Sequence, residues 1–146
     1  MKKVLPAFSA ILFCLIVFFN ITAANEANSN SERYFYEGVH YIASYRDCDN
    51  VNLCDLQKLT QTLLAAAEAS GATVLGHLSH IFPPCGFTMA VLLSESHATI
   101  HTYPEWGACF VDLFTCGTNC SHEAFEKVLK DYLQPKNFET HVLNRD

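Results

Sequence analysis

Chemically reactive side chains gather in one short stretch, residues 94–105, with the sequence Ser-Glu-Ser-His-Ala-Thr-Ile-His-Thr-Tyr-Pro-Glu. In an extended strand alternate residues face the same side, so Thr99, His101 and Tyr103 are expected to share one face. The hydroxyl of Ser96 and the imidazole of His101 are the groups that a nucleophile and its general base require. Serine and histidine at this spacing also occur on ordinary solvated strands, so the pair alone does not establish catalysis.

Several regular elements must position this stretch. Alternating and continuous apolar runs predict strands at 39–45, 73–82, 87–94, 98–103, 109–115 and 137–144. Helical periodicity predicts one helix that Asp55 caps and that runs to about Ser70, and another that Ser121 caps and that runs to Leu133. Gly71 is suited to end the first of these helices.

The order of these elements indicates the fold class. It is strand, helix, four strands, helix, strand, and short hairpin connections favour antiparallel pairing. Both helices then need one common face to cover. We therefore expect an α+β fold, a two-layer α/β sandwich with an antiparallel sheet and the helices on one face.

Length and charge narrow the function classes. The chain has 146 residues, with 9 Lys and Arg against 15 Asp and Glu, and a formal net charge of -6. This length accommodates one compact domain rather than a multidomain enzyme. The acidic balance, without a basic cluster, argues against nucleic-acid binding.

The N-terminal segment predicts a targeting signal. Lys2 and Lys3 precede an apolar run at residues 4–21, and small residues follow it up to Ala24, as is typical of a secretory signal peptide. The run is also long enough to act as an uncleaved membrane anchor. We expect export or membrane anchoring, or a cytoplasmic protein if the segment is not a working signal. The expected organisation is a signal peptide or anchor at 1–24, a polar linker at 25–37 and the folded domain at 38–146.

The cysteines that follow this segment leave two interpretations open. They are Cys48, Cys54, Cys85, Cys109, Cys116 and Cys120. An even number after a signal peptide suggests up to three disulfides in an oxidising compartment. In a reducing compartment they would be buried thiols, metal ligands or a catalytic group. Candidate zinc ligands are His77, His80, Cys85, Cys116 and Cys120, with His97 and His101. Their spacings match no compact zinc motif, so no metal is expected.

A longer motif is more specific than any of these features. Residues 94–105, followed by Val-Asp-Leu-Phe-Thr-Cys-Gly at 111–117, resemble the prokaryotic S-adenosylmethionine decarboxylase proenzymes. Ala-Ser-Gly-Ala-Thr-Val-Leu-Gly at 69–76 and Gly-Val-His at 38–40 are also similar to that family. The resemblance implies a carboxy-lyase that converts S-adenosyl-L-methionine to S-adenosylmethioninamine and CO2 for spermidine and polyamine biosynthesis.

The resemblance also implies that the chain cuts itself between Glu95 and Ser96. The Ser96 hydroxyl would attack the Glu95 carbonyl and exchange the amide for an ester. β-Elimination and hydrolysis would then release ammonia and leave a pyruvoyl group in place of Ser96. A strained turn would supply the required proximity. The pyruvoyl ketone would form a Schiff base with the substrate and act as an electron sink, so no other cofactor and no metal are needed.

The family's remaining functional residues carry over to matching positions. His101 corresponds to the processing base and Cys116 to the acid that protonates the substrate after decarboxylation. Thr88 stands where the family has a processing serine; it keeps the hydroxyl, but its branched side chain restricts the rotamers on which the rate of maturation depends. Phe82 and Tyr103 match the residues beside the adenine, and Glu105 matches the one that accepts the ribose hydroxyls. Without the resemblance, the two aromatic residues would be assigned to the core.

The remaining expectations are the oligomeric state and two alternative functions. The resemblance implies a homodimer of processed α and β chains, with a site that the two protomers can share. A pyruvoyl decarboxylase of this fold could instead act on arginine or ornithine, although Phe82, Tyr103 and Glu105 favour the nucleoside substrate. An unprocessed exported binding protein of the same fold is the other alternative, and in it Cys116 would be paired.

Overall fold

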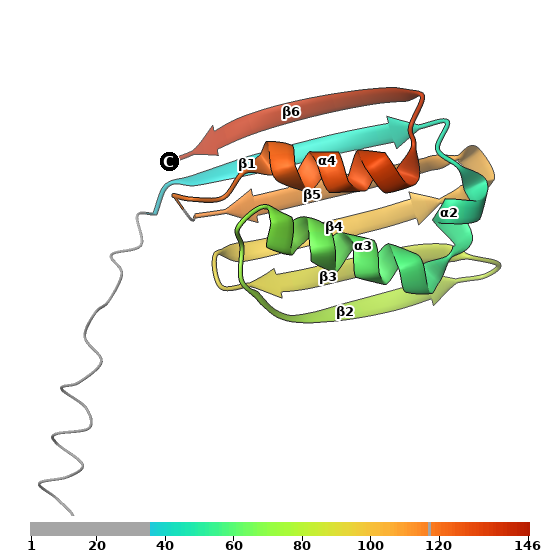
Figure 1. Ribbon diagram of the computed structural model, residues 1–146, viewed down its shortest axis with the longest axis horizontal. Coiled ribbons are helices and arrows are strands. Elements are labelled where there is room, and N and C mark those ends of the chain that lie inside the picture. The colour runs from blue at the N-terminus through green and yellow to red at the C-terminus, as the bar shows by residue number, and fades with distance from the viewer. Residues whose placement is uncertain (1–35, 117) are drawn as a thin grey trace, which may run out of the picture. The chain divides into compact units, whose positions relative to one another are not determined.

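Six antiparallel strands and two long helices form the two layers that the sequence predicts (Figure 1). The computed structural model describes residues 36–116 and 118–146. The strands are β1 (Gly38–Arg46), β2 (Val74–Phe82), β3 (Gly86–Leu93), β4 (Ser96–Tyr103), β5 (Ala108–Thr115) and β6 (Asn137–Arg145). The helices are α2 (Asn50–Cys54), α3 (Leu56–Ala69) and α4 (His122–Leu133), with a 3-10 turn η1 (Pro104–Trp106). Within the described part of the chain, the short α2 is an α-helix that the sequence analysis did not predict.

The sheet has the strand order β2-β3-β4-β5-β1-β6, and every neighbouring pair is antiparallel. Strands β2 to β5 form a continuous meander, while β1 inserts between β5 and the C-terminal β6. Figure 1 shows α3 and α4 side by side across one face of this sheet. We call the opposite face the outer face. The predicted α+β sandwich is therefore confirmed.

Local capping explains where the long helices begin and end. The Asp55 side chain accepts a hydrogen bond from the Lys58 N–H at 3.0 Å, and Ser121 accepts one from the Ala124 N–H at 3.2 Å. Both residues were predicted as N-caps. Gly71 follows α3 with a φ of 92°, which is unstrained only for glycine. The helix boundaries thus follow from short-range sequence signals.

The core lies between the helices and the inner face of the sheet. On β4, Ala98 and Ile100 are completely buried there, whereas His101 and Tyr103 are partly exposed on the outer face. This confirms the alternation predicted for the reactive stretch. The helices supply Leu59, Leu63, Phe125, Leu129 and Leu133 to the same core. Because burying one face fixes the register of a strand, the core also fixes which side chains point outward.

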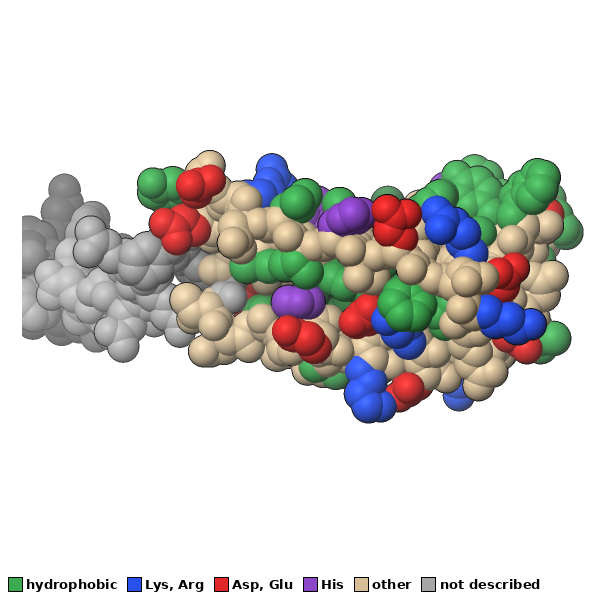
Figure 2. All heavy atoms as spheres, turned by 90° about the horizontal axis from the view of Figure 1, so that it is seen from above, with side chains coloured by type: hydrophobic (Ala, Val, Ile, Leu, Met, Phe, Trp, Pro, Cys, Tyr) green, Lys and Arg blue, Asp and Glu red, His purple; other side chains and the backbone are tan. Residues whose placement is uncertain are grey.

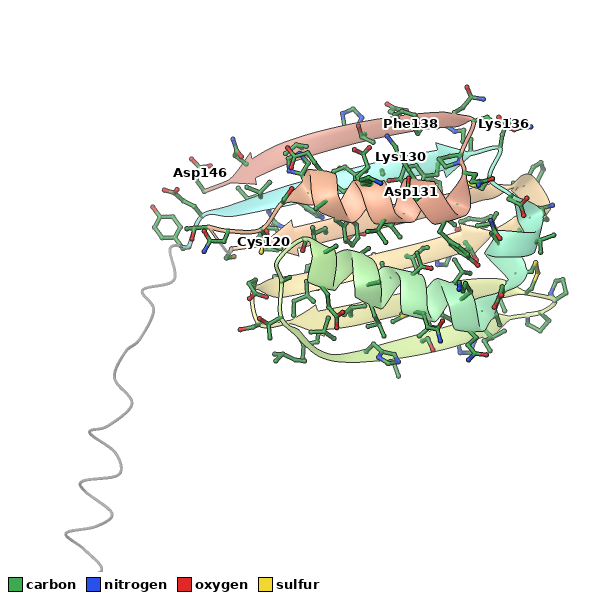
Figure 3. The ribbon with its side chains drawn as sticks, viewed as in Figure 1. Cys120, Lys130, Asp131, Lys136, Phe138 and Asp146 are labelled. Carbon is green, nitrogen blue, oxygen red and sulfur yellow. A yellow bond between two sulfur atoms is a disulfide. The ribbon has the colours of Figure 1, made fainter. Side chains whose placement is uncertain are left out.

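A cation–π contact links α4 to the edge strand β6. The ammonium group of Lys130, on α4, lies 3.3 Å from the ring centre of Phe138, on β6. Figure 3 labels both residues. Along this edge, acidic and basic side chains are interspersed with apolar ones (Figure 2). Charged side chains on an edge strand discourage pairing with a further strand.

Two expectations concern the N-terminal segment and the cysteines. The leader at 1–24 and almost all of the linker at 25–37 lie outside the described residues. Within the described part, no helix has the length and apolar character needed to span a bilayer.

Of the up to three disulfides expected, the described residues contain one, Cys54–Cys85. Cys48, Cys109, Cys116 and Cys120 are free thiols there.

Candidate active site

Ser96 begins β4 directly after the turn that joins it to β3. Its φ is 152°, a backbone conformation that residues with a side chain rarely adopt. The turn is fixed to the chain before β2, because the Ser94 N–H donates to the Thr73 carbonyl at 2.9 Å and the Thr73 N–H donates to the Glu95 carboxylate at 2.8 Å. A strained serine is therefore held firmly at the bond where the sequence predicted cleavage.

The carbonyl of Glu95 is already hydrogen-bonded. The backbone N–H of Cys116, just beyond the end of β5, donates to this oxygen at 3.0 Å. A backbone donor at this position would stabilise negative charge on the oxygen if the carbonyl carbon were attacked. Ser96 is also the register partner of Thr115, so Cys116 lies at the same end of the sheet as Ser96.

His97 is a further neighbour of Ser96. Its Nδ1 lies 3.1 Å from the Ser96 Oγ, within hydrogen-bonding distance. In the sequence analysis His97 was only a candidate zinc ligand, and no contact with Ser96 was predicted for it. Its position directly after the serine was a signal that could have suggested the contact.

A second cluster gathers the other predicted residues. Thr88 and His101 are register partners on β3 and β4, and the threonine hydroxyl contacts the His101 Nδ1. The His101 ring centre lies 4.8 Å from that of Tyr103 and 6.1 Å from that of Phe82. The structure thus brings together, on the outer face, four residues that were each predicted as site residues from the sequence.

This second cluster borders a cavity of about 730 Å³. Its walls include Phe82, His101, Tyr103 and Glu105, together with the Cys54–Cys85 disulfide. The size and the mainly apolar lining with a few polar groups are typical of a small-molecule site. Aromatic faces and a nearby carboxylate suit a ligand with a planar ring and hydroxyl groups.

The two clusters lie apart within one chain. Ser96 and His101 are separated by five residues of β4, which corresponds to about 16 Å along an extended strand. The structure therefore groups Ser96 with Cys116 at one end of the sheet, and Thr88 with His101 at the other. One protomer does not bring the predicted processing base to the predicted cleavage site.

The outer face carries several large, exposed apolar side chains. Among the described residues no helix covers it, and four large apolar side chains on it are 46–80 % exposed: Leu78, Phe82, Leu92 and Phe110. Exposed apolar patches of this kind mark surfaces that bind another molecule.

Comparisons with known proteins give a consistent result. Residues 39–146 match a family model described as S-adenosylmethionine decarboxylase. The chain is 40% identical over 109 residues to the S-adenosylmethionine decarboxylase proenzyme of Parasynechococcus marenigrum (strain WH8102), which covers 75% of this chain and 85% of that protein. It is 42% identical over 106 residues to the proenzyme of the same name from Thermosipho africanus (strain TCF52B), covering 73% and 80%.

A solved structure shares the fold. The crystal structure of the adenosylmethionine decarboxylase from Aquifex aeolicus VF5 superimposes with a TM-score of 0.68 at 29% sequence identity. The match covers 73% of this chain and 88% of that one.

Proposed function

This chain belongs to the S-adenosylmethionine decarboxylase family and is an enzyme that decarboxylates S-adenosylmethionine for polyamine synthesis; we propose that it matures by self-cleavage at Glu95–Ser96 and works as a homodimer with shared active sites. The observation that carries the cleavage proposal is the strained Ser96, whose preceding carbonyl accepts a hydrogen bond from Cys116. Strain and a preorganised donor both favour attack at this one bond.

The cleavage needs only groups of the chain and one water molecule. The Ser96 Oγ attacks the Glu95 carbonyl carbon, the C–N bond breaks, and an ester links the two residues while the serine nitrogen becomes an amine. Removal of the Ser96 α-proton then expels the Glu95 carboxylate by β-elimination. The dehydroalanine that remains tautomerises to an imine, and water converts it to the pyruvoyl ketone with release of ammonia. The Cys116 N–H supports the first step by holding the oxygen on which charge develops.

The residues around position 96 suit a pyruvoyl group. Ser96 is only partly buried, so a substrate can reach it, and the Cys116 residue is already in contact with the same turn. The pyruvoyl ketone would supply an electron sink for the electrons that the departing carboxylate leaves behind. We assign the Cys116 thiol as the group that returns a proton to the substrate carbon, which a free thiol can do and a disulfide cannot.

A homodimer would reunite the two clusters. About 16 Å separates Ser96 from His101 on one chain, so His101 of the same chain is too distant to act on Ser96. In a twofold dimer, each patch contacts the same patch of its partner in reversed orientation. If the apolar outer faces meet in this way, the Ser96 end of each protomer lies against the His101 end of the other. Each of the two sites then draws on both chains.

The cavity favours S-adenosylmethionine over a plain amino acid. Phe82 and Tyr103 provide aromatic faces for the adenine and the sulfonium, and Glu105 provides acceptors for the ribose hydroxyls. A volume of about 730 Å³ is large for arginine or ornithine alone. We therefore place the nucleoside part of the substrate here, with its amino-acid part reaching the partner's pyruvoyl end.

The direct test is the intact mass of the purified protein. We expect two chains that meet at Glu95–Ser96, the second of them lighter by one ammonia than a chain that begins with serine. Ser96→Ala should give one uncut chain, because no side-chain oxygen remains to attack. A single uncut wild-type chain would overturn the self-cleavage proposal. The same spectrum shows whether the first chain begins at Met1 or near Asn25, which tests the signal peptide predicted from the sequence.

A further inference from the structure

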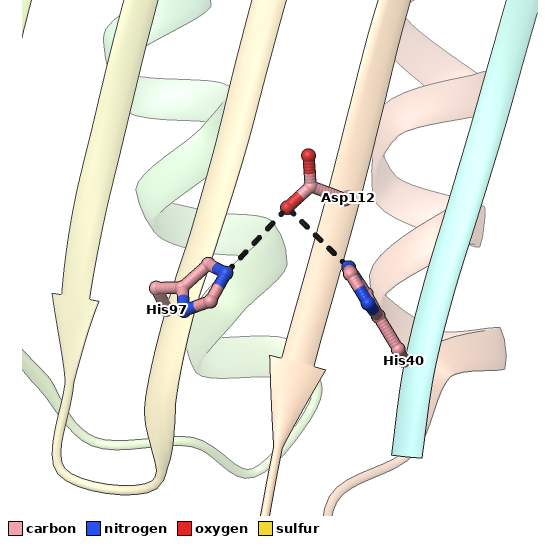
Figure 4. A group of neighbouring side chains, drawn as sticks. All are labelled: His40, His97 and Asp112. Carbon is pink, nitrogen blue, oxygen red and sulfur yellow. Dashed lines mark ion pairs between the residues drawn. The ribbon is translucent and has the colours of Figure 1, made fainter. Parts of the chain in front are cut away.

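Three polar side chains converge on the outer face, away from the cavity. They come from three neighbouring strands: His97 from β4, Asp112 from β5 and His40 from β1 (Figure 4). His97 and His40 are both register partners of Phe114, one on each side of it. Asp112 lies two residues before Phe114 and therefore on the same face. The sheet register thus directs two imidazoles and one carboxylate toward a common point.

The distances leave a gap where an ion would fit. The Asp112 Oδ1 lies 3.8 Å from the Nε2 of His40 and 3.8 Å from the Nε2 of His97. All three atoms lie within 4.8 Å of one another. These separations are too long for hydrogen bonds. A tetrahedral ion with bonds of about 2.0–2.2 Å holds its ligands roughly 3.4 Å apart, so modest side-chain movements would complete the coordination.

His40 supplies a second indication. Its Nε2 is buried and has no hydrogen-bond partner among the described residues. Buried polar atoms nearly always have a partner, and a bound ion can take that place where the protein supplies none. Figure 4 shows this nitrogen directed toward the Asp112 carboxylate.

Neighbouring residues orient the two imidazoles and the carboxylate through hydrogen bonds and ring packing, as is usual around metal ligands. The Thr99 hydroxyl donates to the Asp112 Oδ2 at 2.6 Å, which orients the carboxylate and leaves Oδ1 for an ion. In the uncut chain the Ser96 Oγ can accept from the His97 Nδ1–H, so that Nε2 is the unprotonated nitrogen. The Phe114 ring packs against both imidazoles, at centroid distances of 5.4 Å from His40 and 5.8 Å from His97.

We infer that His40, His97 and Asp112 form a binding site for one divalent transition-metal ion of the Zn2+ or Co2+ type. Two imidazole nitrogens and one carboxylate oxygen are the ligands that such ions prefer, whereas Mg2+ and Ca2+ favour oxygen alone. In the single chain the three side chains are 22–44 % exposed, so an ion can enter from the outer face before that face meets a partner. Before cleavage, a bound ion would fix the His97 ring and thereby the hydroxyl of Ser96. The site rests on its own geometry and does not depend on the proposed function.

The test is a Co2+ titration of the purified protein without an affinity tag, with both fragments of any cut chain present. Visible absorption reports the coordination, and equilibrium dialysis gives the stoichiometry. We expect one ion per chain, and binding at least about tenfold weaker in each of His40→Ala, His97→Ala and Asp112→Asn. Asp112→Asn keeps an oxygen for the Thr99 hydrogen bond, so this variant is expected to retain the local structure.

His141→Ala is the matched control. His141 also lies near a carboxylate, 3.1 Å from Glu139, but both are well exposed on β6. Its removal should leave Co2+ binding unchanged. The inference is overturned if the wild type binds no ion, if binding survives all three ligand substitutions, or if the spectrum shows thiolate coordination by the free cysteines. Thermal unfolding of each variant identifies any that is misfolded, and the mass of the same samples reports self-cleavage independently of metal binding.

Discussion

Ser96 and His101 lie on the same strand, about 16 Å apart, with Ser96 beside Cys116 and His101 beside Thr88. This separation has a functional consequence. A hydroxyl that gives up its proton as it attacks, or an α-carbon that loses its proton, must lie within hydrogen-bonding distance of the base that takes the proton. If both residues take part in maturation, they must come from different chains.

Coexpression of two inactive variants tests whether Ser96 and His101 act from different chains. Neither Ser96→Ala nor His101→Ala should be cut when expressed alone. In a mixed dimer, one site combines the intact Ser96 of the His101→Ala chain with the intact His101 of the Ser96→Ala chain. The His101→Ala chain should therefore be cut when the two are coexpressed, and differently sized tags on the two chains would reveal it by mass. Cleavage of His101→Ala alone would remove His101 from maturation, and no cleavage in the mixture would argue against the shared site.

Thr88 should control the rate of maturation. Thr88→Val keeps the shape of the side chain but removes the hydroxyl that contacts the His101 Nδ1, so cleavage should slow by about 100-fold. Thr88→Ser keeps the hydroxyl and frees its rotation, so it should mature faster than the wild type. The fraction of cut chain against time measures both effects. Equal rates in the wild type and Thr88→Val would show that the hydroxyl has no part in cleavage.

Replacing Cys116 should impair turnover but not self-cleavage. Cys116→Ala retains the backbone N–H that donates to the Glu95 carbonyl, so self-cleavage should continue. Loss of the thiol should reduce the steady-state formation of the decarboxylated product by about 100-fold or more, since protonation of the substrate carbon completes each turnover. Cys120→Ala is the matched control, because Cys120 is a free thiol nearby. Full activity in Cys116→Ala would exclude this thiol as the proton donor.

The Cys54–Cys85 disulfide should stabilise both the fold and the cavity. It joins the end of α2 to the turn before β3 and closes a loop with a sequence separation of 31. Replacing both cysteines by alanine should lower the free energy of unfolding by about 2–4 kcal/mol and raise KM more than it changes kcat. Urea unfolding and steady-state kinetics measure the two effects. Reductant should destabilise the wild type and leave the double variant unchanged; a wild type indifferent to reductant would contradict this role.

Two buried tyrosines predict a loss of stability at alkaline pH. The Tyr41 and Tyr45 hydroxyls lie 2.9 Å apart in the core, and burial raises the pKa of both well above the ordinary value of 10. Their contribution to stability is therefore complete below about pH 10. Above that pH the unfolded chain ionises first, and each tyrosine should cost about 1.4 kcal/mol per pH unit.

Urea unfolding at a series of alkaline pH values checks this prediction. Tyr41→Phe removes one of the two ionising groups, so the free energy of unfolding should fall less steeply with pH. Tyr36→Phe is the control, since Tyr36 is 86 % exposed and should leave the slope unchanged. An unaltered slope in Tyr41→Phe would mean that this hydroxyl ionises as easily in the folded protein as in the unfolded chain.

Much of the fold follows from local sequence signals. Apolar alternation determined which side of β4 faces the core, and Asp55, Ser121 and Gly71 determined the ends of the helices. These signals work because capping and periodic burial depend on residues within one element. The long motif at 94–117 likewise identified the family before any contact was known.

The tertiary structure decided which distant residues became neighbours. His40 lies far along the chain from His97 and Asp112, and only the pairing of β1 with β5 brings it to them. The pairing of Cys54 with Cys85 is a similar case, because six cysteines allow about 15 connectivities. A sequence fixes the side of a strand on which each residue lies, but the register between strands fixes what that residue meets.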